Sequence, residues 1–148
     1  ACAPGSVPVG GGWWADPGLN VTISMPAGNG WAVTAVDEVG VGIDRNLKAY
    51  AVCLSDPSAT SVPSLATFDL HPGAVGAFDG IDCPPGGMLT GGGFAADDAF
   101  FVSSIPFADS GQDPSDDNWL VRLRIYGESD PAGPTVELRV FGVCLLGP

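Results

Sequence analysis

Four cysteines are the residues of this 148-residue chain best suited to chemistry. Cys2, Cys53, Cys83 and Cys144 lie about 30 residues apart or more. A zinc site built from four thiolates usually takes its ligands from closely spaced pairs, so zinc is the less favoured of two alternatives. Disulfides are the other, and four cysteines allow three different pairings.

A run of acidic residues, DSGQDPSDDN, is the candidate metal site. Calcium prefers several carboxylate and carbonyl oxygens from one loop. The candidate ligands are Asp109, Asp113, Asp116 and Asp117. Their spacing differs from that of an EF-hand loop, and a solvated loop without metal is the alternative. We expect no other cofactor.

The usual catalytic residues are isolated or missing. His71 is the one histidine, and its motif DLHPG is typical of a turn. No serine stands in a GxSxG motif, and a disulfide-bonded cysteine is not a nucleophile. Paired carboxylates could hydrolyse glycosides, but the acidic residues cluster in predicted turns such as Asp97–Asp98. We therefore expect no enzyme, with a small hydrolase as a remote alternative.

The elements that must position these residues are encoded twice. CAPGSVPVGGGW begins at Cys2, and CPPGGMLTGGGF begins at Cys83. Each motif is followed by Ser-x-Pro, by a tryptophan that opens an apolar strand and by a final Cys-Leu. We therefore predict a first β repeat at residues 1–54, connecting strands at 55–82 and a second β repeat at 83–148, together forming one compact unit.

The repeat selects one of the three disulfide pairings. Cys2 would pair with Cys53 and Cys83 with Cys144, so that each bridge joins the start of a repeat to its end. Disulfides persist in oxidising compartments. Ala1 is a small residue of the kind that signal-peptidase cleavage leaves. We therefore expect a secreted, extracellular protein at the cell surface.

The composition favours an all-β fold. Twenty-two glycines and fourteen prolines separate short apolar runs, and no stretch has a sustained helical period. We predict two tandem glycine-rich antiparallel β repeats in a compact sandwich-like, prism-like or barrel-like domain. The strands between the repeats have no counterpart before Cys2, so the first repeat either shares them or leaves a sheet edge open.

The clearest strand pattern lies near the end of the chain. Residues 119–126 and 135–145 both alternate apolar and polar side chains. We predict that these two strands pair side by side, with Glu137 near Arg122 or Arg124 on the solvent face.

Trp14 is the candidate residue for contact with a ligand or partner. In the aligned repeats Trp13 matches Phe94, which assigns both to the core, whereas Trp14 matches Ala95. An unmatched aromatic ring is available to stack on a sugar or a protein. Filling the core is the slightly favoured alternative for Trp14.

The charge of the chain restricts its partners. Seventeen acidic and five basic residues give a net charge of −12, which repels nucleic acids and anionic lipids. No apolar run is long enough to insert into a membrane. The mean hydropathy is nevertheless positive at +0.26, which indicates apolar surface that contact with another molecule would bury. We therefore expect self-association into a homo-oligomer or filament.

The second repeat resembles a glycine-rich disulfide module of secreted bacterial proteins, here present in two copies. The shared pattern is CPxG, GGG, Ser-x-Pro, a tryptophan strand and a closing AxC, matched by CPPGGMLTGGGF, SSIP, WLVRLRIYG and VFGVCL. Gly142 replaces the closing alanine, and Ala3 replaces the first proline of the first repeat. The resemblance implies a non-enzymatic exported or cell-surface part.

These observations predict an extracellular structural protein, a subunit of a surface assembly, coat or filament. A viral fibre or decoration protein would have the same physical properties. A carbohydrate-binding or adhesive module is the alternative, motivated by Trp14.

Overall fold

The computed structural model describes residues 1–38, 40, 43–56, 58–78, 81–96, 99–108, 117–125 and 134–147, and these residues contain only strands and connections. This confirms the predicted all-β class. The described residues form no helix that is long and apolar enough to cross a membrane. The strands are β1 (Val7–Ala15), β2 (Leu19–Pro26), β3 (Trp31–Asp37), β4 (Leu47–Leu54), β5 (Thr60–Leu70), β6 (Val75–Phe78), β7 (Gly87–Ala95), β8 (Ala99–Ala108), β9 (Asp117–Ile125) and β10 (Val136–Leu146).

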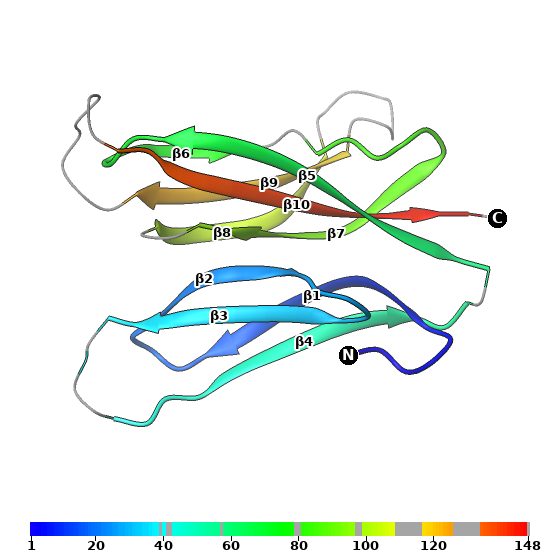
Figure 1. Ribbon diagram of the computed structural model, residues 1–148, viewed down its shortest axis with the longest axis horizontal. Helices are drawn as coiled ribbons and strands as arrows, with labels where there is room; N and C mark the ends of the chain where they lie inside the picture. Colours follow the sequence, from blue (N-terminus) through cyan, green and yellow to red (C-terminus); the bar gives the residue numbers. More distant parts are fainter. Residues whose placement is uncertain are drawn as a thin grey trace.

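The strands form three open sheets in which every pairing is antiparallel. Their orders are β1–β4, β3–β2–β7–β10–β5 and β6–β9–β8. Because each sheet ends in unpaired edge strands, the described strands form no closed barrel. Figure 1 shows β1–β4 together on the lower side of the molecule and β5–β10 on the upper side. We call these parts the N-terminal half (residues 1–54) and the C-terminal half (residues 55–148).

One strand pairing predicted from the sequence is wrong. β10 pairs with β7 and β5, whereas β9 pairs with β6 and β8. Both strands carry an apolar row, and these rows join the same buried cluster from different sheets. Side-chain alternation shows which residues face inward, but not which strands are neighbours. Glu137 therefore pairs with Arg139 on its own strand, at 3.0 Å, and not with Arg122 or Arg124.

The apolar core lies mainly in the C-terminal half. Its fully buried side chains include Ile81, Phe94, Leu123, Leu138 and Val140. In the described N-terminal half, the buried large apolar residues are Val21, Trp31 and Pro8. Burial of apolar surface is the main stabilising contribution to folding, so the C-terminal half holds most of it.

The two disulfides join Cys2 to Cys53 and Cys83 to Cys144, as predicted from the repeat. All four cysteines are therefore bonded, which excludes the four-thiolate zinc site. The first bridge ties the end of β4 to the start of the chain, and the second ties the end of β10 to the segment before β7. Such bridges suggest an oxidising environment outside the reducing cytoplasm.

Candidate functional site

The middle glycine of each triplet packs closely against the ring of a tryptophan. A Cβ atom added to Gly11 would overlap the indole of Trp31, and one added to Gly92 would overlap the indole of Trp119. Glycine within a strand marks such close approaches. The middle glycine of each triplet therefore allows the tryptophan ring to lie directly against the strand backbone.

The serine of each Ser-x-Pro motif accepts a hydrogen bond from the same tryptophan. Trp31 Nε1 donates to Ser24 Oγ at 2.9 Å, and Trp119 Nε1 donates to Ser104 Oγ at 2.7 Å. A buried indole N–H requires an acceptor. The order Ser-x-Pro then Trp was visible in the sequence, but this contact was not predicted from it.

The halves meet through residues at matching positions. A Cβ atom on Gly91 would lie 2.6 Å from Gly10 Cα, so β1 and β7 approach backbone to backbone. The rings of Trp13 and Phe94 meet edge to face with their centroids 5.5 Å apart. Phe94 is buried as expected, but Trp13 is partly exposed, because it lies at this junction instead of within a core.

The main difference between the halves concerns β4 and its counterpart β10. β10 pairs with β7 on one side and with β5 on the other. β4 pairs with β1, and within the described ranges no strand occupies its second edge. Tyr50 and Val52 on β4 are 52% and 59% exposed, whereas Val143, which matches Val52, is 1% exposed.

One surface of the β1–β4 sheet lies next to the open edge of β4. The register sets Trp14 opposite Lys48, Gly12 opposite Tyr50, and Gly10 opposite Val52. Residues directly opposite each other in an antiparallel pair lie on the same surface. Gly10 is buried against Gly91 of β7, so the open part of this surface consists of Trp14, Lys48, Tyr50, Val52 and Gly12, which we call the β4 face.

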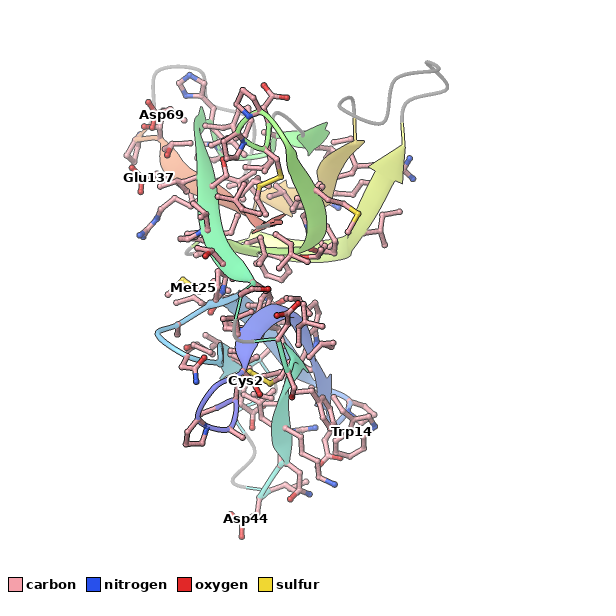
Figure 2. All side chains as sticks on the ribbon, turned by 90° about the vertical axis from the view of Figure 1, so that its right-hand side faces the viewer. Cys2, Trp14, Met25, Asp44, Asp69 and Glu137 are labelled. Carbon is pink, nitrogen blue, oxygen red and sulfur yellow. A yellow bond between two sulfur atoms is a disulfide. The ribbon has the colours of Figure 1, made fainter. Side chains whose placement is uncertain are left out.

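Trp14 lies on the outer side of the N-terminal half, as Figure 2 shows. Its side chain is 46% exposed, so the alternative of complete core filling is not met. Lys48 Nζ lies 5.2 Å from the centroid of the Trp14 ring, a cation–π contact that covers part of that ring. Contact of Trp14 with a ligand or partner stays a prediction.

The inward-facing side chains of β4 are less buried than those of β10. Ala49 is exposed where the matching Val140 is fully buried. In β10, Ile81 packs so closely on Gly142 that an added Cβ atom would overlap it. Ala51, which matches Gly142, is only half-buried. The inward-facing side chains of β4 are therefore only partly covered.

Polar contacts hold the start of β4 in place. Asp16 Oδ2 accepts hydrogen bonds from the backbone N–H of Asn46 at 2.7 Å and from Asn46 Nδ2 at 3.0 Å. These bonds, first the backbone one, lower the pKa of Asp16 below its ordinary value. Arg45 Nε pairs with Asp37 Oδ2 at 3.2 Å, and its guanidinium also donates to the carbonyl of Pro17. The loop before β4 is thus anchored to the ends of both β1 and β3.

The proposed calcium ligands are not brought together in the described structure. Asp109, Asp113 and Asp116 lie outside the described residues, and Asp117 begins β9 without a described side chain. The part of the chain that the structure describes contains no group of three or more potential metal ligands. Calcium binding at the acidic loop stays a prediction.

No catalytic arrangement is formed by the described candidates. His71 is exposed at the turn between β5 and β6, where its carbonyl accepts the N–H of Ala74 at 3.1 Å. Asp97 and Asp98 lie outside the described residues. A cavity of about 160 Å³ between the halves has no titratable side chain in its lining, which consists of Val7, Pro8, Pro26, Gly28, Ser61, Pro63 and Val143.

Comparison of the chain with models of protein families, with curated proteins and with solved structures finds no match. The resemblance to a glycine-rich disulfide module therefore stays a prediction. The β4 face and the unpaired edge of β4 are the features of the described structure that bear most directly on function.

Proposed function

We propose that this protein is a non-enzymatic structural subunit of an extracellular assembly such as a surface layer, coat or filament. The observation that carries this proposal is the unpaired edge of β4 beside the exposed apolar side chains of the β4 face. An edge strand offers a row of unpaired backbone N–H and C=O groups that another strand can satisfy. Self-association through such edges joins copies without a separate binding pocket.

Among the edge strands of the three described sheets, β4 is the longest that contains no proline. β1 contains Pro8, β5 contains Pro63 and β8 contains Pro106, and proline cannot donate to a strand ladder. β6 has only four residues, and β3 ends at the charged Asp37. β4 is eight residues long, contains no proline and has one charged residue, Lys48. β4 is therefore the edge best suited to receive a partner.

The proposal includes a tandem duplication arranged as a compact sandwich. Residues 1–54 would be the first repeat, 55–82 the connecting strands and 83–148 the second repeat. The matching glycine–tryptophan contacts, tryptophan–serine hydrogen bonds and disulfides of the two halves support this origin. On this view β5 and β6 complete the second repeat, and β4 of the first repeat pairs only with β1 among the described strands.

Association of the purified protein tests this function. Sedimentation analysis over a range of protein concentrations should show oligomers, and negative-stain microscopy should show regular assemblies. Added salt should strengthen association, because it screens repulsion between copies that each carry a charge of −12. A strict monomer at high concentration and high salt contradicts the proposal.

A carbohydrate-binding or adhesive role is the second candidate. It is favoured by the exposure of Trp14 and Tyr50 on one surface, with only Gly12 opposite Tyr50. A flat aromatic surface can stack on the apolar face of a sugar ring. A glycan array, with and without calcium, tests this role: binding should be lost in Trp14→Ala and kept in Met88→Ala, which alters an exposed apolar residue of β7. Lys48 over the Trp14 ring makes this role secondary.

A further inference from the structure

We propose that β4 pairs antiparallel with β4 of a second molecule across a two-fold axis, with Tyr50 at the axis. The resulting sheet would run β1–β4–β4–β1 through both molecules. This inference rests on the proposed function and deepens it, because it names the partner and the surface of the first contact in the assembly.

The partner that suits the β4 edge best is β4 itself. Its second edge leaves the backbone groups of an eight-residue strand without a ladder partner among the described residues. A matching strand of equal length and without proline satisfies these groups over almost the whole strand. The edge strands β1, β5 and β8 contain proline, β6 is half as long, and β3 is seven residues long and ends at the charged Asp37. Two copies of one surface related by a two-fold axis also form the commonest kind of oligomer interface.

The distribution of charge favours contact between N-terminal halves. Residues 1–54 contain four of the seventeen acidic and two of the five basic residues, which leaves thirteen acidic and three basic residues in 55–148. Figure 1 shows β4 on the side of the N-terminal half away from β6–β10. Pairing through β4 therefore keeps the strongly acidic halves at opposite ends of the dimer, where their repulsion is weakest.

The alternation of side chains limits the register. Residues directly opposite each other must point to the same face of the joined sheet. This holds only if the two-fold axis passes beside a residue and not beside a peptide bond. With Tyr50 there, the two exposed tyrosine rings lie side by side, a favourable aromatic pair. Val52 then lies opposite Lys48 of the second molecule, and this contact occurs twice because of the symmetry.

This register makes an unusual prediction for charged variants of Val52. Val52→Lys sets like charges opposite each other at both contacts and should raise the dimer dissociation constant by about tenfold, whereas Val52→Glu should lower it by about threefold. Net charge alone predicts the reverse, because a lysine reduces and a glutamate increases the repulsion between chains of charge −12. The double variant Val52→Lys with Lys48→Glu should restore the wild-type dissociation constant to within about threefold.

Sedimentation equilibrium at low salt measures these constants on the intact disulfide-bonded chain. Leu65→Lys and Leu65→Glu are the matched controls, because Leu65 is similarly exposed on β5 and outside the proposed contact. They should show only the smaller, opposite effect of net charge. Circular dichroism and thermal melting of all variants should match the wild type, since Val52, Lys48 and Leu65 are all exposed.

The outcomes separate this inference from the proposed function. Opposite responses to Val52→Lys and Val52→Glu, in the stated directions and absent from the Leu65 variants, support the β4 dimer. Association that follows net charge equally at both positions overturns the β4 dimer and leaves an assembly through another surface. A monomer at every concentration contradicts both.

Discussion

The two halves of this molecule build the same local contacts and reach different degrees of burial. Both seat a tryptophan on a glycine triplet, bond its indole to a serine and close with a disulfide. Yet Val143 on β10 is buried, while its match Val52 on β4 is exposed. Val143 lies at the junction with Val7 and Pro8 of the N-terminal half, whereas no described strand pairs with the second edge of β4, beside Val52. Local motifs therefore fix local contacts, whereas neighbouring strands determine burial.

Removal of a disulfide should have the largest effect and should distinguish the halves. Cys83→Ser with Cys144→Ser should lower the free energy of unfolding by about 4 kcal/mol, since the bridge closes a long loop and Cys144 is buried. The pair Cys2→Ser with Cys53→Ser should cost less, because Cys53 is exposed and leaves no buried hydroxyl. Urea denaturation measures both values.

Shortening the matched leucines of β10 and β4 should destabilise the protein to different extents. Leu138→Ala should destabilise the protein by about 3 kcal/mol, because Leu138 is fully buried in the core. Leu47→Ala should cost about 1 kcal/mol, because Leu47 lies only partly buried at the start of the open strand. Equal losses in chemical denaturation would mean that β4 is covered as well as β10.

The two tryptophan–serine hydrogen bonds should contribute equally to the stability of the protein. Ser24→Ala and Ser104→Ala should each lower the free energy of unfolding by about 1 kcal/mol, because each leaves an indole N–H without its acceptor. Ser58→Ala, on an exposed turn, is the control and should cost less than either. A loss at one serine only would break the proposed equivalence of the two contacts.

The smallest effect is expected from Asp16. Its pKa is lowered in the folded state by the Asn46 hydrogen bonds, so its contribution to stability is present above its ordinary pKa of about 4 and is lost as pH falls through the lowered value. Asp16→Asn should therefore reduce stability slightly at pH 7 and have no effect at about pH 2. An NMR titration of the Asp16 carboxyl measures the pKa itself, and a value at or above the ordinary one contradicts the assignment.

Much of this fold could be predicted from the sequence, and the failures have a physical origin. The repeat identified both disulfides because it marked the start and end of each unit, and alternation identified the inward rows of β9 and β10. Alternation could not show that these strands belong to different sheets, because an apolar row fits either arrangement. The sequence also left two alternatives for the connecting strands, and the structure pairs β5 with β10 and leaves β4 open.

The candidate site could be predicted less completely. Trp14 was singled out because it lacks an aromatic match, but the slightly favoured expectation that it fills the core is wrong, since Trp14 is exposed. The exposure of Tyr50 and Val52 was not predicted, because alternation does not show which face of a strand another part of the chain covers. Their counterparts Phe141 and Val143 are half-buried and buried, respectively. A residue's type sets what it can bind, and its neighbours in space decide whether it is available.

Hydrogen–deuterium exchange at low and high protein concentration tests the central claim most directly. If β4 is the assembly edge, amides of residues 47–54 should exchange more slowly as the protein associates, while those of residues 136–146 should be protected equally at both concentrations. Association that leaves exchange in residues 47–54 unchanged would show that β4 is not the surface that joins the molecules.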